Sequence, residues 1–231
     1  MGLEKPIHAM AGSLVGVNTS QPVFHLTFDD GPHPDVTPRV LDVLSEHQVT
    51  ATFFVLTERA QQHPELIDRL KRQGHEIALH TRTHPRLTET PLAQMIDEIR
   101  HARRDLEEVT KTKVRWFRPP YGAQNLRSLA VVRASGMQTV LWSVDSWDWK
   151  GLTAENPLER RAERLTPGGI LLMHDTPADE SGDDAAKGLI AKDELTALYL
   201  AELAKRGLEA VSLDDLLAAG TPTRRAKFSR G

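Results

Sequence analysis

The sequence predicts a single-domain α/β protein built as a closed or nearly closed β/α barrel. Short β-branched and aromatic runs alternate with amphipathic helical segments about seven times along the 231 residues. No linker or change of composition divides the chain, and neither G-x-G-x-x-G nor G-x-x-x-x-G-K-[ST] is present. Strands that each continue into a helix run parallel, and a barrel buries them at this length. An open doubly wound sheet is the alternative, which the missing phosphate-binding loop disfavours.

The first half of the chain shows the alternation clearly. Val23-Phe24-His25-Leu26 is too short for a helix and lies between proline and glycine signals, which predicts a buried strand. Thr37-Pro38 supplies a capping hydroxyl and a first-turn proline for the helix that follows. The same signals predict strands at 50–56 and 75–80, a helix from Pro64 to Gly74, and a long helix from Thr90-Pro91 leading into a strand at 114–117.

The second half repeats the pattern. We expect a helix near 126–135, a strand at 139–144, a helix at 157–165, a turn at Gly168-Gly169 and a strand at 170–173. A helix at 192–206, a strand at 208–211 and a short helix at 213–219 complete the domain. Residues 1–22 are predicted as an N-terminal extension, residues 23–220 as the domain, and residues 221–231 as a basic C-terminal tail.

Composition limits the class of protein. With 39% hydrophobic and 26% charged residues and a net charge of −3, the chain resembles an ordinary globular protein rather than a nucleic-acid binder. The lack of cysteine excludes thiolate metal ligands and disulfides. No signal peptide or membrane span is evident, so we expect the protein to be cytoplasmic as the chain stands, or secreted if a leader has been removed. We also expect a monomer.

Titratable residues follow five of the predicted strands. Barrel active sites form at the carboxyl ends of the strands, so these residues are expected to converge. A lone histidine is more often structural than a ligand, but five such groups on one rim are hard to assign to structure alone. In chain order they are Asp29-Asp30, His80 with His84, Arg118 with Tyr121, Asp145 with Asp148, and His174-Asp175.

His80 and His84 are the expected metal pair, because their i, i+4 spacing lets both imidazoles reach one ion. A carboxylate from Asp29 or Asp30 would complete a site with open positions, which is typical of a catalytic ion. Neighbouring side chains on a strand point in opposite directions, so one carboxylate can bind the cation while the other acts as a base. Zinc is the default, and cobalt, nickel, iron or manganese also suit these ligands. An ordinary Asp-Gly-Pro turn with two surface histidines is the alternative.

Five segments of the chain resemble, in order, the motifs of the NodB-type polysaccharide deacetylases, carbohydrate esterase family 4. They are Thr27-Phe-Asp-Asp-Gly-Pro32, His80-Thr-Arg-Thr-His84, Arg118-Pro-Pro-Tyr121, Asp145-Ser-Trp-Asp-Trp149 and Leu172-Met-His174. The similarity spans about residues 23 to 215. It implies a distorted (β/α)7 barrel and a metal-dependent hydrolase that removes N-acetyl groups from N-acetylglucosamine-containing glycans of the chitooligosaccharide or peptidoglycan type, releasing acetate and a free amine.

The resemblance also implies a role for each motif residue. Asp30, His80 and His84 would bind the metal, Asp29 would be the general base held ionised by Arg118, and His174 would be the general acid tuned by Asp148. The backbone N–H of Tyr121 would face the oxyanion. Leu172 and either Trp147 or Trp149 would line the acetyl pocket, the other tryptophan stacking on a sugar or packing beneath the loop.

Other interpretations stay open at this point. The same metal site can hydrolyse an acetyl ester, as on xylan, or a non-sugar amide. A catalytically silent glycan-binding module is expected to have lost Asp29 or His174, and both are present. Trp142, His25 and His75 are expected to be structural. The acidic segment 175–184 is expected to be a solvated loop, with attraction of a cationic glycan as the alternative.

Overall fold

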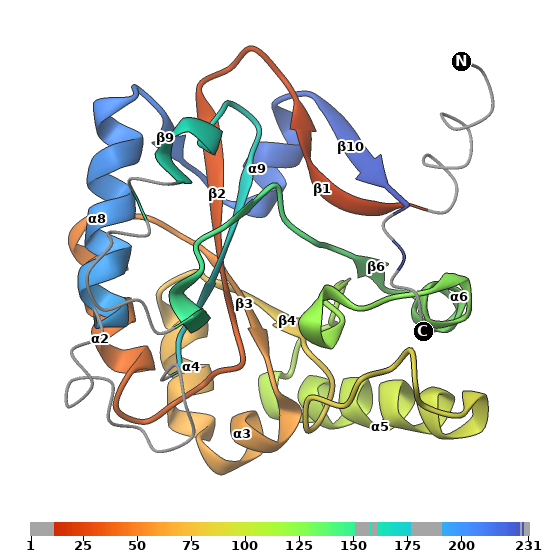
Figure 1. Ribbon diagram of the computed structural model, residues 1–231. Coiled ribbons are helices and arrows are strands. Elements are labelled where there is room, and N and C mark those ends of the chain that lie inside the picture. Colours follow the sequence, from red (N-terminus) through yellow and green to blue (C-terminus); the bar gives the residue numbers. More distant parts are fainter. Residues whose placement is uncertain (1–11, 151–157, 159–160, 177–190, 227, 229–231) are drawn as a thin grey trace, which may run out of the picture.

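The computed structural model of the protein describes residues 12–150, 158, 161–176, 191–226 and 228. Seven parallel strands form a curled sheet in the order β6-β5-β4-β3-β2-β8-β7, and β9 pairs with β2 beside this path (Figure 1). This arrangement confirms the predicted parallel β/α barrel. The strands are β2 (Val23–Asp29), β3 (Thr52–Val55), β4 (Glu76–Leu79), β5 (Trp116–Phe117), β6 (Gln138–Thr139), β7 (Val144–Asp145), β8 (Ile170–His174) and β9 (Glu209–Ala210).

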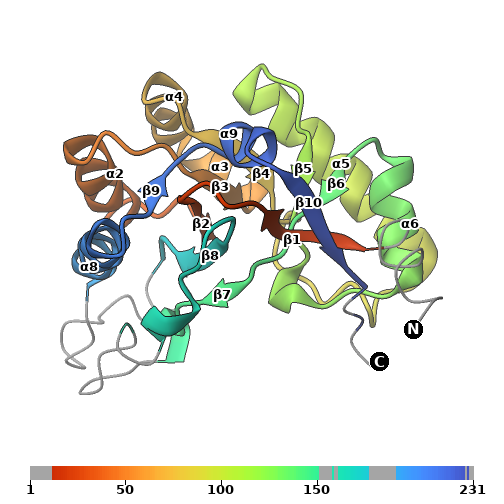
Figure 2. The same ribbon diagram turned by 90° about the horizontal axis from the view of Figure 1, so that it is seen from above.

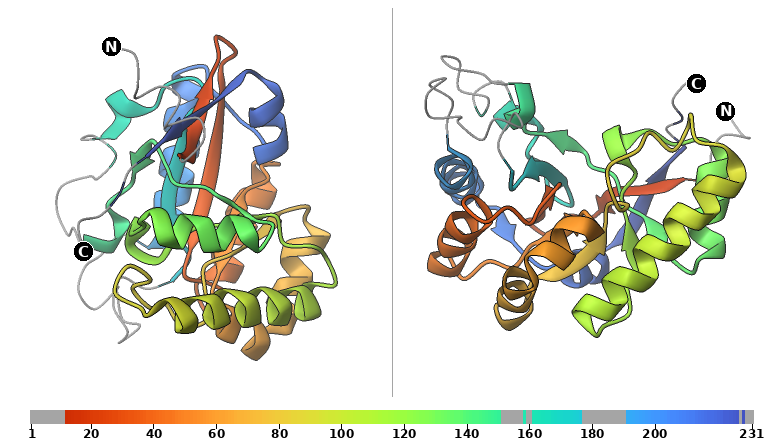
Figure 3. Two further views of the ribbon diagram at one scale, coloured as in Figure 1. Left: turned by 90° about the vertical axis from the view of Figure 1, so that its right-hand side faces the viewer. Right: turned by 90° about the horizontal axis from the view of Figure 1, so that it is seen from below.

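Helices surround the outer face of the sheet, as the views from above and below show (Figures 2 and 3). The longer helices carry apolar side chains on the face that packs against the strands, which is what their 3.6-residue periodicity predicts. The helices are α2 (Thr37–Glu46), α3 (Thr57–Gln62), α4 (Pro64–Arg72), α5 (Leu92–Thr110), α6 (Leu126–Ala134), α8 (Lys192–Lys205) and α9 (Leu213–Ala218). The described residues also contain the 3₁₀ turns η1 (Pro120–Gly122), η2 (Asp148–Lys150) and η3 (Ala162–Arg164).

Strand β2 lies inside the sheet between β3 and β8 and divides its side chains between two environments. Phe24, Leu26 and Phe28 belong to the apolar core between sheet and helices, where Phe28 stacks on Phe53 with ring centres 4.9 Å apart. His25 and Thr27 alternate with them and hydrogen-bond on the inner side of the barrel. Asp29 continues this inner series because side chains alternate along a strand. The strand therefore delivers one carboxylate to the barrel interior.

Segments within the predicted N-terminal extension and C-terminal tail form a pair of strands. Strand β1 (Ser13–Asn18) pairs antiparallel with β10 (Thr221–Arg225). β1 also bridges to Val140, next to β6, and to Gly169, just before β8. The six residues of β1 therefore connect the two edges of the curled sheet.

The strand expected at 139–144 is two short strands at opposite edges of the sheet. β6 pairs with β5, whereas β7 pairs with β8. Between them the chain crosses the open side, where Leu141 N–H donates to Leu14 O and Ser143 N–H donates to Ile170 O. The apolar pattern of this segment reflects burial against β1, because no single strand partner runs along it.

Two other elements differ from expectation. Helix α3 is an element that the sequence pattern does not predict, and α5 begins at Leu92 after Pro91. Most of the helix expected at 157–165 lies outside the described residues, which contain Leu158 and the turn η3. Within the ranges described above, no helix is long and apolar enough to cross a membrane.

Replacing Gly168 by alanine tests the packing of β1 against the sheet. Gly168 has φ +77°, and an added Cβ would lie 1.9 Å from the carbonyl oxygen of Val17. Gly207 has φ +68° with open space around it, so Gly207→Ala is the matched control. We expect the control to lose about 1–2 kcal/mol from the left-handed backbone, and Gly168→Ala to lose about 1–3 kcal/mol more from the collision. Equal midpoints in urea unfolding would contradict this packing.

Candidate active site and metal centre

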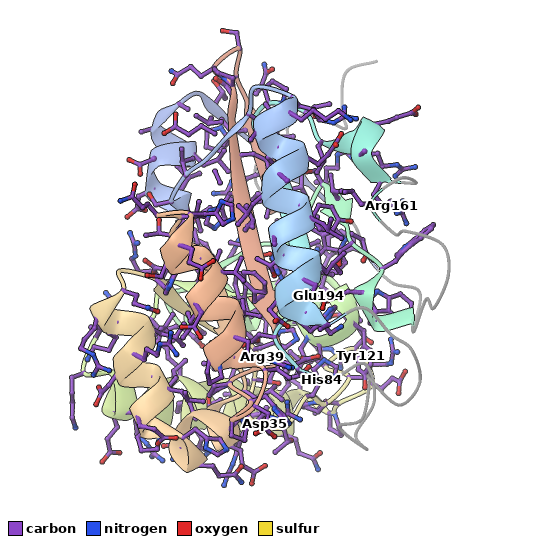
Figure 4. All side chains as sticks on the ribbon, turned by 90° about the vertical axis from the view of Figure 1, so that its left-hand side faces the viewer. Asp35, Arg39, His84, Tyr121, Arg161 and Glu194 are labelled. Carbon is purple, nitrogen blue, oxygen red and sulfur yellow. The ribbon has the colours of Figure 1, made fainter. Side chains whose placement is uncertain are left out.

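The motif residues meet at the carboxyl ends of the parallel strands. A cavity of about 310 Å³ opens there, and Figure 4 shows two of its residues, His84 and Tyr121, at this end of the molecule. Its position agrees with the rule that barrel sites form beyond the carboxyl ends of strands. The cavity is lined by Asp29, Asp30, His80, His84, Tyr121, Gly122, Trp142, Asp145, Trp149, Leu172 and His174.

Asp29 is held by a fully buried arginine. Arg118 Nη1 donates to Asp29 Oδ1 at 2.6 Å, and both side chains are almost completely removed from water. The same nitrogen donates to Thr27 Oγ1, while Nε and Nη2 donate to the carbonyl oxygens of Val140 and Leu141. Burial lowers the pKa of Arg118 and the charge of Asp29 opposes that effect. The pair orients one carboxylate oxygen and leaves the other facing the cavity.

Asp30, His80 and His84 form the candidate metal centre. Asp30 Oδ1 lies 3.3 Å from His80 Nε2 and 3.4 Å from His84 Nε2, and the three ligating atoms all lie within 4.8 Å of one another. Asp30 Oδ1 is buried, and in the described part of the chain it has no hydrogen-bond partner. An orphaned buried carboxylate oxygen beside two imidazoles is the arrangement that a bound cation would complete.

The protonation of the two imidazoles supports this interpretation. His80 Nδ1 lies 2.8 Å from the carbonyl oxygen of Arg118, which can only accept, so Nδ1 carries the hydrogen and Nε2 presents a lone pair. Burial, with repulsion from His80, lowers the pKa of His84 to about 4, which keeps its ring neutral. Burial alone would raise the pKa of Asp30, but the adjacent His80 lowers it on balance. The donor set of one carboxylate and two imidazoles therefore fits a divalent metal ion.

Tyr121 offers its backbone to the cavity. The residue has φ 61°, in the left-handed region, and within the described residues its N–H has no hydrogen-bond acceptor. The residue is 59% exposed, and its ring is held between the ring of His84, 4.4 Å away between centroids, and the guanidinium of Arg86, 4.3 Å from the ring centre. Tyr121 can therefore contribute an amide donor inside the cavity and an aromatic surface at its rim.

His174 and Asp148 form a buried acid pair at the carboxyl end of β8. His174 Nδ1 lies 2.8 Å from Asp148 Oδ1, and the His174 backbone N–H donates to Asp148 Oδ2. Burial alone would lower the pKa of His174, but the charge and hydrogen bond of Asp148 raise it to about 9. Burial alone would likewise raise the pKa of Asp148, but Lys192 and His174 lower it well below its usual range. At neutral pH the pair is an imidazolium and a carboxylate.

Lys192 is the member of this group that the sequence did not suggest. Its Nζ donates to the carbonyl oxygen and to Oδ2 of Asp148, at 2.9 and 3.2 Å. Lys192 lies outside all five motif segments, and a lysine at the start of a helix gives no sign of burial. Only the tertiary packing that places the start of α8 beside η2 brings it to the site.

The two motif tryptophans have different environments, and a third lines the cavity. Trp149 lines it and donates from Nε1 to Asp145 Oδ1 at 3.3 Å. Trp147 is absent from the lining and packs against the guanidinium of Arg161. Trp142, expected in the core, is half-buried and lines the cavity with Leu172. The broken strand around Trp142 explains the difference, because the sequence pattern resembled a continuous buried strand.

Other titratable residues are structural, as expected for His25 and His75. His25 is buried between Val211 O and Thr52 Oγ1, and burial lowers its pKa to about 4. His75 accepts from the Ala51 N–H. Asp175 accepts from Thr37 Oγ1, and burial raises its pKa to about 7. The acidic residues expected to form a loop, Asp179, Glu180, Asp183 and Asp184, lie outside the described residues.

Comparison with known proteins agrees with the fold. A family model described as polysaccharide deacetylase matches residues 16–140. A chitooligosaccharide deacetylase of Bradyrhizobium sp. (strain ANU 289) is 36% identical over 214 residues, 91% of this chain and 97% of that protein. A peptidoglycan-N-acetylglucosamine deacetylase of Bacillus cereus is 36% identical over 152 residues, 66% of this chain and 55% of that protein. The solved structure of the Bc1960 peptidoglycan N-acetylglucosamine deacetylase superposes with a TM-score of 0.82 at 28% identity, covering 94% of this chain and 97% of that chain.

Together with these matches, the curled parallel barrel and the His/Asp cluster at its strand ends place the protein in the class of α/β-barrel hydrolases. The matched segment contains the residues of the first three motifs, Asp29 to Tyr121. The chain belongs to the polysaccharide deacetylase family, NodB-type carbohydrate esterase family 4.

Removing Arg118 should destabilise the protein strongly. Arg118→Met leaves Asp29 as a buried, uncompensated carboxylate, which typically costs about 3–5 kcal/mol. Arg104→Met is the control, because Arg104 pairs with Asp105 on the surface and its loss should leave stability nearly unchanged. Denaturant unfolding measures both. A loss in Arg118→Met as small as in the control would show that the buried pair does not hold the barrel.

Proposed function

We propose that the protein is a metal-dependent N-deacetylase acting on N-acetylglucosamine units of glycans of the chitooligosaccharide or peptidoglycan type, which yields acetate and a free amine. The observation that carries this proposal is one cavity with a carboxylate held by Arg118, a metal-ligand cluster and a histidine paired with a carboxylate. The named activities of the Bradyrhizobium and Bacillus cereus relatives support the substrate class.

The metal centre would be Asp30, His80 and His84, and zinc is the proposed ion, with cobalt, nickel, iron and manganese as alternatives that suit the same ligands. A bound divalent ion supplies Lewis-acid polarisation of the acyl oxygen and acidifies water. The tetrahedral oxyanion accepts a hydrogen bond from the Tyr121 N–H, which has no acceptor among the described residues. A preorganised donor of this kind typically contributes about 10²–10³ in rate.

Asp29 is the proposed general base. Arg118 occupies Oδ1, so Oδ2 is the atom that takes a proton from the attacking water. The fixed guanidinium also prevents rotation of the carboxylate. Base catalysis of this kind typically contributes about 10²–10⁴ in rate.

His174 is the proposed general acid. Its Nδ1 is engaged by Asp148, so Nε2 carries the proton that is delivered to the leaving amine as the C–N bond breaks. Trp149, Trp142 and Leu172 supply the apolar wall against which an acetyl methyl group would pack. The Tyr121 ring and Trp149, both exposed, are the surfaces on which a sugar ring would stack, and Trp147 packs behind the loop against Arg161.

Acetate release tests the activity directly. Metal-stripped protein should release acetate from penta-N-acetylchitopentaose only after zinc or cobalt is added, and Asp29→Asn should lower the rate by about 10²–10⁴. Asp35→Asn is the matched control, since Asp35 is exposed and lies a few positions further along the chain. Peptidoglycan fragments and acetylated xylan are compared in parallel. Preferential release from xylan would favour ester hydrolysis, and no release from any substrate with metal would contradict the proposal.

The pH dependence of turnover should report His174. Its pKa is raised to about 9, so the protonated acid persists at neutral pH and kcat should fall as pH rises through about 9. The same shift is a stability effect. A pKa raised above the ordinary 6.5 contributes stability that is complete below pH 6.5 and is lost as pH rises through about 9.

The stability effect is measured by comparing the free energy of unfolding of the protein and of His174→Gln across that range. The difference should be larger in the acid part of the range than above it. His47→Gln, at an exposed position, is the control for the loss of an imidazole. A constant difference would show that Asp148 does not stabilise the imidazolium.

A further inference from the structure

Lys192 is a buried lysine directed at the acid pair. It is the first residue of α8, and its side chain is 3% exposed. Its Nζ contacts two oxygens of Asp148, the backbone carbonyl and Oδ2. Lysine is almost never fully buried unless it is paired. The burial of Lys192 is therefore tied to Asp148.

Helix stability does not account for Lys192. A cation in the first turn of a helix opposes the helix dipole, which favours negative charge there. Asp193 and Glu194 follow it in the same turn and supply that favourable charge. Figure 4 places this end of α8, marked by Glu194, at the end of the molecule that carries His84 and Tyr121. The position of Lys192 is therefore explained by the site rather than by the helix.

Both oxygens of the Asp148 carboxylate accept two hydrogen bonds each from neighbouring groups. Oδ1 accepts from Ser146 Oγ and from His174 Nδ1, and Oδ2 accepts from the His174 N–H and from Lys192 Nζ. This set of donors prevents rotation of the carboxylate. It also fixes which nitrogen of His174 keeps a hydrogen, because Nδ1 always faces an ionised oxygen.

Charge balance gives Lys192 a further role. Before proton transfer the buried group contains the Asp148 carboxylate and the His174 imidazolium. After transfer His174 is neutral, and Asp148 would be a buried carboxylate without a counter-charge, which is strongly unfavourable. The ammonium group of Lys192, 3.2 Å from Asp148 Oδ2, supplies that counter-charge.

We propose that Lys192 is a positioning residue for the general acid, which holds Asp148 ionised and oriented in both protonation states of His174. The mobile proton then leaves from Nε2 while Nδ1 stays protonated. This inference rests on the proposed role of His174 as the general acid.

Other charged and titratable groups also act on this pair, and they come from several elements. The charges of Asp29 and Asp30, at the end of β2, help to raise the pKa of His174. Tyr199 on α8 interacts electrostatically with Asp148. Among the residues described here, Lys192 and His174 are the two cations that directly contact Asp148. Once His174 has given up its proton, no second cation replaces Lys192 if it is removed.

The test compares Lys192→Met, Lys192→Gln and Lys192→Arg. Methionine keeps most of the side-chain volume, glutamine keeps a hydrogen-bond donor without charge, and arginine keeps the charge. Lys205→Met is the control, because Lys205 lies on the same helix, is 78% exposed and pairs with Glu202. Acetate release is measured with metal-loaded protein over a range of pH.

We expect kcat to fall about 10- to 100-fold in Lys192→Met and Lys192→Gln, the usual size for a buried partner that orients a functional side chain. KM should change little, because Lys192 does not line the cavity. The alkaline limb of kcat should move to higher pH, since the imidazolium becomes the main counter-charge of Asp148 and releases its proton less readily. Lys192→Arg should restore most of kcat and the position of the limb.

A second readout does not depend on activity. ¹⁵N NMR of the His174 ring reports which nitrogen carries hydrogen, and we expect a single Nδ1–H tautomer above the pKa in the protein and in Lys192→Arg. Lys192→Gln should give a mixture of tautomers. Thermal unfolding of each variant shows whether it is folded under the assay conditions.

The outcomes separate the two proposals. If the unmodified protein releases no acetate from any glycan, the proposed function fails, and the NMR result still tests Lys192. If acetate is released and Lys192→Gln keeps kcat, the alkaline limb and the tautomer of the unmodified protein, Lys192 is only structural and the inference is overturned. A fall in thermal stability with no change in these three quantities overturns it equally.

Discussion

The buried guanidinium of Arg118 is the constraint on which the rest of the structure depends. A charge removed from water must have its donors satisfied, and Arg118 satisfies them with Asp29 and Thr27 on β2 and with the carbonyl oxygens of Val140 and Leu141. Those carbonyls lie where the chain crosses the open side of the barrel. The interaction that orients the proposed base therefore also holds the two sides of the barrel together.

The strand ends show how the fold places polar groups without disturbing the core. Within the described part of these loops, five residues other than glycine have positive φ, which are Asp30, Thr81, His84, Tyr121 and Trp147. Backbone in this region is unfavourable for such residues and persists only where the surroundings enforce it. The left-handed turn after β2 directs Asp30 to the histidines while Asp29 stays with Arg118. Local backbone strain is thus the means by which adjacent carboxylates reach different partners.

The proposed base, Asp29, and the proposed acid, His174, are held in the same way. Each is a titratable group held by a buried charge of opposite sign, Arg118 for Asp29 and Asp148 for His174. Lys192 extends the second arrangement by one residue. Because buried charges are costly unless paired, both arrangements have a nearly complete set of hydrogen bonds, and the cluster around Asp30 Oδ1 is the place in the cavity where a partner is missing within the described residues.

The sequence by itself determined the β/α alternation and the loops that meet at the strand ends. Hydrophobic periodicity and the effects of proline and glycine are local, and the spacing of the motifs can be seen directly in the sequence. It also placed Asp30, His80 and His84 in one group, which the structure brings together. Only the tertiary structure decided that β1 and β10 pair from opposite ends of the chain, that the segment 139–144 serves both edges of the sheet, and that Trp142 and Lys192 reach the site. These contacts form between residues that are distant in the chain, and the local sequence around a residue does not indicate which distant residue it will contact.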